Sequence, residues 1–267
     1  METISEKEKN LFEILRAADS AVIAFSGGVD SSYLLWAARE ILGERAVAVT
    51  LDLATVPRRE KETAIAFCRE RHISHKMLAV DQYEIPGFSE NPKDRCYLCK
   101  RALFENLKRE AAREGLAIVA DGTNADDAKG YRPGLRALAE LGIRSPLREA
   151  NLSKAEIREL SHRAGLATWD APSFACMATR FPYGTKITPE GLSRVEAAED
   201  FLREKGFAQF RVRVHGDLAR IELPPEDFRK FSEIRTETAI YFRKIGFLYV
   251  TLDVEGFRSG SFDGDKR

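Results

Sequence analysis

The chain has 267 residues, 44% of them hydrophobic and 31% charged, which is enough to bury one large core or two smaller ones. Its 42 lysines and arginines balance its 42 aspartates and glutamates, so no net positive field attracts a polyanion, and a small substrate is favoured over nucleic acid. The polar amino terminus and the lack of an apolar stretch of ~18 residues predict a cytoplasmic protein with no membrane partner.

Strands and helices are expected to alternate over the first two thirds of the chain. The expected strands are four short apolar runs, at 21–25, 46–51, 76–80 and 116–120. The expected helices are amphipathic, at 3–17, 31–42, 57–71 and 98–114, with another that begins after Ser153 and runs to about Ala164. This alternation predicts an α/β fold, a parallel sheet with helices on both faces, in which ligands bind beyond the carboxyl ends of the strands.

The pattern changes from Thr188 onward, where shorter elements of both kinds follow one another. They are expected as helix 189–205, strands 209–214 and 218–223, helices 225–231 and 233–244, and strand 246–252. We therefore predict a larger domain over residues 1–184, a smaller α+β domain over 185–255 that binds substrate or forms oligomers, and a disordered tail over 256–267.

A glycine-serine turn, Ser26-Gly27-Gly28-Val29-Asp30-Ser31-Ser32, separates the first strand from the helix after it. Adjacent glycines let the backbone approach an anion, and the first amides of a helix have no acceptor inside it. The turn has no Gly-Lys-Ser/Thr ending, so it is not a Walker loop. The alternative is an ordinary tight turn. We predict that ATP phosphates bind to Ser26, Gly27, Gly28, Asp30, Ser31 and Ser32.

A second polar loop, Asp121 to Asp127, follows the fourth expected strand and should lie at the same edge of the sheet. We predict that Gly122 and Thr123 contact ATP and that Asp126 and Asp127 are possible Mg²⁺ ligands. The alternative is an Asx-rich turn that caps the next helix. Farther along the chain, Lys154 and Arg158 either approach a leaving pyrophosphate or lie on a solvated helix face.

The four cysteines are too few for a disulfide scaffold, and three of them have a pattern typical of chemistry. Cys96 and Cys99 form a C-x-x-C pair, which suits a redox pair, half of a zinc site or ligands of a cluster. Cys176 lies in a loop of small residues, where its sulfur is accessible and Arg180 favours a thiolate. Cys68 lies on the apolar stripe of a helix and is expected in the core.

Two arginines, Arg211 and Arg213, alternate along an expected strand and therefore share one face of it. Paired guanidinium groups suit a phosphate or a carboxylate ligand. The alternative is a half-exposed strand whose arginines contact water or carboxylates of the same chain.

Five segments together resemble the LarE family of ATP-dependent sulfur transferases, which belongs to the PP-loop ATP pyrophosphatase superfamily. The loop alone marks the superfamily, whereas Pro-Ser-x-Ala-Cys at 172–176 and Arg-x-Arg-x-His-Gly at 211–216 narrow the resemblance to the family. The segments are Ser26–Ser32, Asn91–Cys96, Asp121–Asn124, Pro172–Gly184 and Arg211–Arg220.

The resemblance implies synthesis of the nickel-pincer nucleotide cofactor of lactate racemase. ATP and Mg²⁺ would adenylate a carboxylate of pyridinium-3,5-biscarboxylic acid mononucleotide, pyrophosphate would leave, and sulfur would displace AMP to give a thiocarboxylate. Arg180, Arg211 and Arg213 would hold the phosphate and carboxylates of this substrate. The resemblance also implies a homohexamer.

In the family, the cysteine that matches Cys176 attacks the acyl-adenylate. Single-cysteine members surrender its sulfur and keep dehydroalanine, whereas other members hold a [4Fe-4S] cluster on three cysteines. Because this chain has three matching cysteines, we predict a cluster on Cys96, Cys99 and Cys176 whose open iron binds an exogenous sulfide. The sacrificial route through Cys176 stays open at this point.

Three other functions fit the same loop. A PP-loop tRNA thiolase would need a basic surface, and zero net charge together with a single C-x-x-C pair counts against it. The other two are an ATP-sensing regulator that catalyses nothing, and an ammonia-using synthetase, whose chemistry would not require Cys176.

Overall fold

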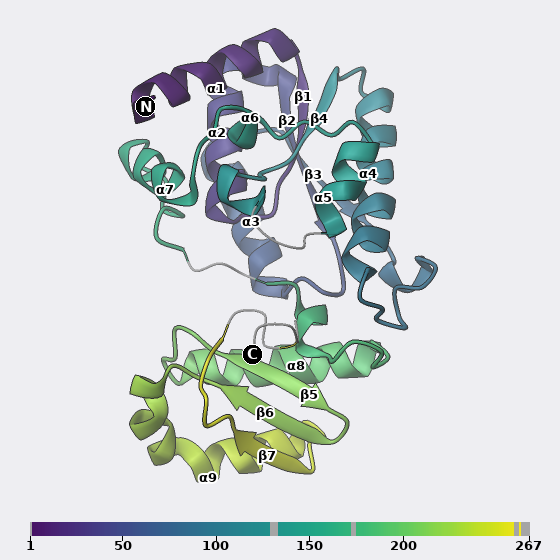
Figure 1. Cartoon of the computed structure of the whole chain (residues 1–267), viewed down its shortest axis with the longest axis vertical. Coiled ribbons are helices and arrows are strands. Elements are labelled where there is room, and N and C mark those ends of the chain that lie inside the picture. The colour runs from purple at the N-terminus through teal and green to yellow at the C-terminus, as the bar shows by residue number, and fades with distance from the viewer. Residues whose placement is uncertain (1, 129–132, 172–174, 259–261, 263–267) are drawn as a thin grey trace. The chain divides into compact units, whose positions relative to one another are not determined.

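The computed structural model describes residues 2–128, 133–171, 175–258 and 262. By its internal contacts the chain divides into two compact units, one of residues 1–86 and 94–174 and the other of residues 87–93 and 175–267 (Figure 1). The expected boundary at residue 184 falls within the second unit. Most of the expected tail, residues 259–261 and 263–267, lies outside the described residues.

The first unit contains a four-stranded sheet whose paired strands are all parallel, as expected. Its strands are β1 (Ala21–Ala24), β2 (Ala46–Asp52), β3 (His75–Ala79) and β4 (Ile118–Ala120), in the order β3-β2-β1-β4. The chain lays down β1, β2 and β3 in one direction and then crosses back, so that β4 lies on the other side of β1. Ligands of such sheets bind where this direction reverses, beyond the carboxyl ends of β1 and β4.

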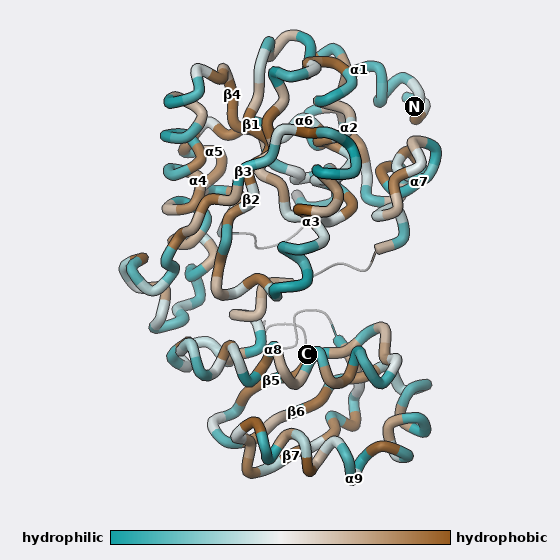
Figure 2. Tube along the Cα trace, turned by 180° about the vertical axis from the view of Figure 1, so that it is seen from behind, coloured by the Kyte–Doolittle hydropathy of each residue, from teal (hydrophilic) through white to brown (hydrophobic). Residues whose placement is uncertain are grey.

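Helices cover both faces of this sheet, which confirms the α/β class (Figure 1). One face is covered by α1 (Ile4–Ala18), α2 (Val29–Leu42), α3 (Arg58–Glu70), α6 (Pro146–Glu149) and α7 (Lys154–Arg163). The other face is covered by α4 (Arg95–Arg113) and α5 (Pro133–Glu140). Hydrophobic residues follow the strands, and hydrophilic residues occupy the outer helix turns (Figure 2).

Alternation along the strands decides which side chains enter each core. Ala21 and Ile23 of β1 pack with Leu11 and Leu15 of α1 in one buried cluster, because successive strand residues point to opposite faces. Helix α7 begins with the expected capping box, in which the Ser153 and Glu156 side chains satisfy each other's backbone amides. Helices α5 and α6 were not expected from the sequence.

The second unit contains a three-stranded sheet beside two long helices. Its elements are α8 (Pro189–Glu204), β5 (Arg211–His215), β6 (Leu218–Glu222), α9 (Phe228–Lys244) and β7 (Tyr249–Leu252). The sheet order is β5-β6-β7, with β5 antiparallel and β7 parallel to β6. The expected helices 225–231 and 233–244 are wrong, because α9 is one continuous helix after a short turn at Pro225–Asp227. Within this helix the Ser232 hydroxyl donates to the Arg229 carbonyl.

A short excursion, residues 87–93, joins the second unit although it precedes α4 in the chain. Asn91 is buried there; its amide donates to the Pro182 carbonyl at 2.8 Å, and its own carbonyl accepts from the Gly184 amide at 2.8 Å. Because these bonds satisfy both the side chain and the backbone of Asn91, they hold the excursion against residues nearly a hundred positions later.

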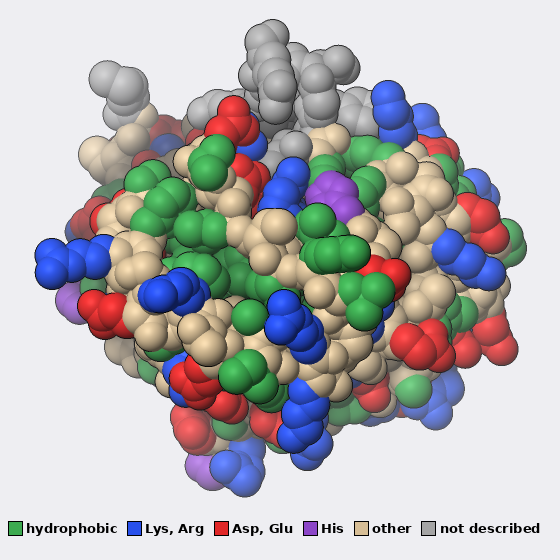
Figure 3. Space-filling model, turned by 90° about the horizontal axis from the view of Figure 1, so that it is seen from below, with side chains coloured by type: hydrophobic (Ala, Val, Ile, Leu, Met, Phe, Trp, Pro, Cys, Tyr) green, Lys and Arg blue, Asp and Glu red, His purple; other side chains and the backbone are tan. Residues whose placement is uncertain are grey.

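Positive and negative side chains are mixed on one face of the molecule. On the face seen in Figure 3, lysine and arginine side chains are interspersed with aspartate and glutamate side chains. Over the part of the chain that the structure describes, no helix combines the length and apolar character that crossing a bilayer requires.

Candidate functional site

The glycine loop has the conformation that an anion needs. Gly27 has a φ of +77°, which favours glycine, and Gly28 caps α2 without a side chain. The Ser26 and Ser31 hydroxyls lie 3.0 Å apart, and the Ser26 amide donates to the Ser31 hydroxyl at 3.3 Å. Ser26 is exposed, whereas Ser31 and Ser32 are buried beneath it. Hydrogen bonds therefore fix the serine side chains of the loop beside the first amides of α2, which have no acceptor within the helix.

The loop after β4 meets the glycine loop at the point where the sheet order reverses. A Cβ added to Gly122 would lie only 3.0 Å from the Ser31 amide nitrogen, so the two backbones approach as closely as a glycine permits. The Asn124 amide reaches the Asp30 carboxylate at 3.4 Å. Thr123 is buried and donates to the Asp121 carboxylate at 2.5 Å. The structure thus brings Gly122 and Thr123 together with Asp30 and Ser31.

Asp126 and Asp127 brace this loop. The Asp126 carboxylate accepts from the Lys154 amide at 2.9 Å, and the Asp127 carboxylate accepts from the Asn124 amide at 3.1 Å. The Lys154 ammonium forms an ion pair with Asp30. Among the described residues, no group of three or more acidic, histidine or cysteine side chains is placed to hold a metal ion. Mg²⁺ binding by Asp126 and Asp127 therefore stays a prediction.

Of the two basic residues of α7 considered from the sequence, only Lys154 reaches the glycine loop through its side chain. The Arg158 guanidinium donates to the Trp169 and Ala171 carbonyls, each at 2.8 Å. Arg158 therefore holds the segment after α7 and is not directed at a phosphate in this arrangement.

Two residues that the sequence did not single out, Ser145 and Lys100, converge on Asp121. The Asp121 carboxylate accepts from the Ser145 hydroxyl at 2.7 Å and lies 3.8 Å from the Lys100 ammonium. Ser145 arrives there because Arg144 makes a parallel bridge with Ala120, which adds a rudimentary strand beside β4. In the sequence, the available signal for Ser145 was a short polar run after apolar residues. The bridge between Arg144 and Ala120 is too short to be predicted as a strand.

The C-x-x-C pair lies in the first turn of α4, where positions i and i+3 are neighbours on one helix face. Cys96 is exposed and Cys99 is half-buried. Each sulfur has an N–H donor within reach, Arg95 at 3.9 Å from Cys96 and Gln82 at 3.3 Å from Cys99. Because Lys100 pairs with Asp121, this turn lies at the same edge of the sheet as the nucleotide loops.

The other two cysteines lie elsewhere. Cys176 is exposed and belongs to the second unit, just before the short turn Met177–Arg180, and residues 172–174 of its loop lie outside the described residues. The convergence of Cys176 with the C-x-x-C pair therefore stays a prediction. Cys68 is buried in the core as expected, and burial raises the pKa of its thiol to about 12.

Arg180 and Arg213 are already engaged within the second unit. Arg180 binds both oxygens of Glu199, at 2.7 and 2.8 Å, and both side chains are almost fully buried. Arg213 pairs with the buried Glu222 at 2.9 Å and donates to the Thr179 carbonyl at 2.7 Å. These two guanidinium groups hold α8, β5 and β6 together.

The Arg211 guanidinium donates to the Phe210 carbonyl at 2.7 Å. Burial, and after it the positive charge of Arg180, lowers the pKa of Arg211 to about 10. Its guanidinium lies 5.1 Å from the centre of the Phe257 ring. Because Arg211 is half-buried and its pKa is lowered mainly by desolvation, a bound anion would stabilise its charge, and substrate binding by Arg211 stays a prediction.

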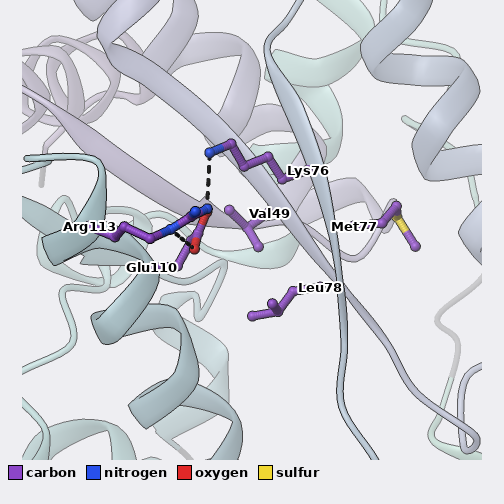
Figure 4. A pocket seen from close by; sticks show the side chains of 6 residues that line it. All are labelled: Val49, Lys76, Met77, Leu78, Glu110 and Arg113. Atoms are coloured by element: carbon purple, nitrogen blue, oxygen red, sulfur yellow. Dashed lines mark hydrogen bonds and ion pairs between the residues drawn. The ribbon is translucent and has the colours of Figure 1, made fainter.

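Two depressions mark the surface of the first unit. The smaller, about 120 Å³, lies between the glycine loop and the start of α3 and is lined by Ser26, Gly27, Arg59, Glu60 and Thr63. The larger, about 290 Å³, is lined by Val49, Lys76, Met77, Leu78, Glu110 and Arg113 (Figure 4). In the larger one Lys76 and Arg113 both pair with Glu110, near the far end of α4 from the cysteines. Because Glu110 and Glu114 already pair with both cations of the larger depression, we assign the candidate ligand site to the glycine loop instead.

One family model and three known proteins show what this chain is similar to. Residues 20–91, which include the glycine loop, match the family model of the queuosine biosynthesis protein QueC. The chain is 36% identical to the pyridinium-3,5-bisthiocarboxylic acid mononucleotide synthase of Lactiplantibacillus plantarum, over 97% of this chain and 95% of that protein. It is 42% identical to an uncharacterized protein of Synechocystis sp., over 97% and 98%. A partial similarity, 29% over 56% of this chain and 40% of the relative, links it to argininosuccinate synthase of Pyrococcus furiosus.

Proposed function

The chain belongs to the LarE family of pyridinium-3,5-bisthiocarboxylic acid mononucleotide synthases, and from this premise we propose that it inserts sulfur into pyridinium-3,5-biscarboxylic acid mononucleotide at the expense of ATP. The observation that carries the proposal is the meeting of the Ser26–Ser32 loop with the Asp121–Asn124 loop, at the sheet edge where the C-x-x-C turn also lies. Two thiols and the loop that would bind phosphate therefore lie in one region of the first unit, which supports the proposal.

Adenylation explains why such an enzyme needs ATP. A carboxylate is a poor electrophile, and its oxygen is a poor leaving group until AMP is attached. We propose that the amides of the glycine loop bind the phosphates and that Lys154 stabilises the charge of the departing pyrophosphate. Asp30, with Asp126 and Asp127 nearby, would hold the Mg²⁺ that neutralises the polyphosphate.

We further propose that Cys96, Cys99 and Cys176 hold a [4Fe-4S] cluster. The donor set fits, since two of the thiols are one helical turn apart, the described cysteines form no disulfide, and two of the three are exposed. Three thiolates leave one iron without a protein ligand, and a sulfide bound there would be the sulfur donor. If no cluster forms, the Cys176 thiol itself would attack the acyl-adenylate, forming a C–S bond as the C–O bond to AMP breaks.

One experiment separates these routes. Anaerobically reconstituted protein should contain four irons per chain, and Cys96→Ala, Cys99→Ala and Cys176→Ala should each lower iron content and thiocarboxylate formation while pyrophosphate release continues. Cys68→Ala, a control in the core, should keep its iron. Protein without iron that nevertheless forms product, and in which Cys176 loses the mass of H₂S after one turnover, would establish the sacrificial route. Absence of pyrophosphate release with ATP and the dicarboxylate would refute the whole proposal.

For the substrate, we propose that Arg211 contacts the phosphate or a carboxylate, with Arg180 and Arg213 shaping the site around it. Arg211→Ala should weaken binding of the mononucleotide, because an anion loses a partly desolvated cation, and should leave ATP binding unchanged. Arg229→Ala, on the exposed side of α9, is the matched control. Unchanged affinity in Arg211→Ala would remove this assignment.

We propose a homohexamer without nucleic-acid partners. Light scattering on a sizing column measures the mass of the assembly. A gel shift with bulk tRNA tests the alternative of a tRNA thiolase, and the mixed charge of the surface in Figure 3 supports the expectation of no shift.

A further inference from the structure

Gln82 connects the cysteine pair to the loop after β2. It is 1% exposed and lies in the short turn Gln82–Glu84 that follows β3. Its Oε1 accepts from the Thr55 amide at 3.1 Å and from the Thr55 hydroxyl at 3.0 Å, and its Nε2 donates to the Cys99 sulfur at 3.3 Å. A single buried amide therefore contacts both the turn after β2 and a thiol at the start of α4.

The orientation of this amide follows from its neighbours. A backbone N–H can only donate, so the side-chain oxygen of Gln82 must face Thr55. The NH₂ group must then face Cys99, and the sulfur is obliged to act as an acceptor. A thiolate or a metal-bound sulfur accepts such a bond far better than a neutral thiol does, since charge-assisted hydrogen bonds are about twice as strong as neutral ones.

We infer that Gln82 is a positioning residue for the sulfur chemistry: its oxygen is anchored by Thr55, and its N–H holds the Cys99 sulfur in place as a ligand. The metal-ligand part of this inference rests on the proposed cluster, whereas the hydrogen bond does not. Hydrogen bonds to ligand sulfurs raise the reduction potential of a cluster, because they stabilise the added negative charge. Gln82 would thus act on the reactivity of the sulfur through Cys99, without touching the substrate.

Two substitutions separate the donor from the anchor. Gln82→Glu keeps the shape of the side chain and an oxygen toward Thr55, but replaces the donor that faces Cys99 with an acceptor. Gln82→Met removes both the donor and the anchor. If Gln82 only supports the loop, Gln82→Met is the more harmful change; if it serves the sulfur, Gln82→Glu is.

The measurement uses iron-free, reduced protein and the rate of alkylation by iodoacetamide at one pH, resolved by peptide mass spectrometry. The Cys99 rate divided by the Cys96 rate should fall about tenfold in Gln82→Met, because losing a hydrogen bond to a charged group costs about that factor. It should fall further in Gln82→Glu, because the carboxylate that replaces the donor also repels the thiolate. Cys176 in the same digest is an internal reference, and Gln209→Glu, exposed in the second unit, is the matched control. An unchanged ratio in both Gln82 variants would overturn the inference.

Reconstituted protein supplies the second measurement. The cluster of Gln82→Glu should have a lower midpoint potential than that of the wild type. If the buried carboxylate prevents folding, Gln82→Met must still lower both the alkylation ratio and the potential. Wild-type protein that takes up no iron would refute the cluster while leaving the alkylation result to decide the role of Gln82.

Discussion

Two ion pairs, one near the glycine loop of the first unit and one between strands of the second, differ in their burial. In the first, the ion pair beside the glycine loop is partly open to solvent, with the Lys154 and Asp30 side chains 29% and 21% exposed. In the second, the Arg213–Glu222 pair is 5% and 0% exposed. An exposed pair exchanges its partners at little cost, whereas breaking a buried pair leaves a charge without solvent or counter-ion. Charges near the glycine loop are therefore available to a ligand, and most of those near β5 hold the fold.

This difference changes how charged motifs are interpreted. Arg-x-Arg on a strand and a lysine at the start of a helix look equally suited to bind phosphate in the sequence. The structure distinguishes them by the carboxylate with which each cation is paired. The buried Glu199 and Glu222 pair with arginines of the second unit, whereas Lys154 pairs with a partly exposed aspartate at the glycine loop. Arg211 is half-buried, and desolvation is the main cause of its lowered pKa.

The largest effect should come from breaking the buried network. Glu222 accepts from both Arg213 and Arg220, so Glu222→Gln leaves two guanidinium groups short of charge and should lower the free energy of unfolding by about 3–5 kcal/mol. Tryptophan fluorescence would report on the first unit, which contains both Trp36 and Trp169. The appropriate measurement is therefore hydrogen exchange of peptides over 211–222 in denaturant.

The control for this change is an exposed pair of the first unit. Glu62→Gln breaks the Arg58–Glu62 pair, whose side chains are 86% and 59% exposed, and should change stability by about 0.5 kcal/mol or less. If Glu222→Gln proved equally mild, the arginines of β5 would be exchangeable charges, and the contrast between the units would disappear.

The next largest effect is on catalysis and not on stability. Asp30→Asn keeps the size of the side chain but removes the charge that pairs with Lys154 and that would face Mg²⁺. Pyrophosphate release should slow by about 10²-fold, the scale of losing one preorganised electrostatic contact, while the free energy of unfolding changes by about 1 kcal/mol or less. Asp19→Asn, in an exposed pair with Arg45 before β1, should affect neither quantity appreciably. A large loss of stability in Asp30→Asn would instead show that the pair of Asp30 with Lys154 stabilises the fold.

Much of the fold could be predicted because its signals are local. Buried parallel strands are short apolar runs, and the helices between them are amphipathic, so the expected strand at 46–51 and helix at 57–71 lie within one or two residues of β2 and α3. The expected break between helices 225–231 and 233–244 is wrong, because α9 runs through Ser232, whose hydroxyl bonds back to the Arg229 carbonyl within the helix.

The candidate site was predictable where a motif defines it and not where tertiary contacts do. The Ser26–Ser32 turn combines glycines, hydroxyls and a helix start, so its chemistry is contained in seven residues. Gln82, Lys100 and Ser145 are ordinary polar residues whose meaning comes from strand order, which brings the ends of β3 and β4 and the start of α4 to one edge. Likewise, nothing local to Arg213 reveals Glu222 on the adjacent strand as its partner.

A smaller effect is expected where the two loops of the first unit touch. Gly122→Ala would place a methyl group 3.0 Å from the Ser31 amide nitrogen and 3.2 Å from its Cα, so one loop must shift. Overpacking of this kind costs about 1–3 kcal/mol, and ATP affinity should fall about tenfold by calorimetry. Gly142→Ala is the control, because its φ of +67° strains an alanine although no atom lies within 4 Å. Gly142→Ala should lower stability and leave ATP affinity unchanged. If both variants changed ATP affinity equally, the contact between Gly122 and Ser31 would not be needed for ATP binding.

The smallest effect concerns pH, and it again separates the units. Burial lowers the pKa of His75, which lies on β3 against the Thr50 hydroxyl, and partial desolvation followed by the charge of Arg220 lowers the pKa of His215 on β5. Above the ordinary value of 6.5 both rings are neutral, folded or unfolded, so stability is complete there. As the pH falls below that value, the unfolded chain takes up protons first and stability declines until the folded pKa values are passed.

Urea unfolding between pH 7 and pH 5 should therefore show a decline that His75→Gln and His215→Gln each reduce. Salt distinguishes the two causes, because it screens the charge of Arg220 near the exposed His215 ring but does not restore water to the half-buried His75 ring. Added salt should shrink the contribution of His215 and leave that of His75 in place. If salt acted equally on both, His75 would be responding to a charge and not to burial, and the core of the first unit would be more polar than its packing indicates.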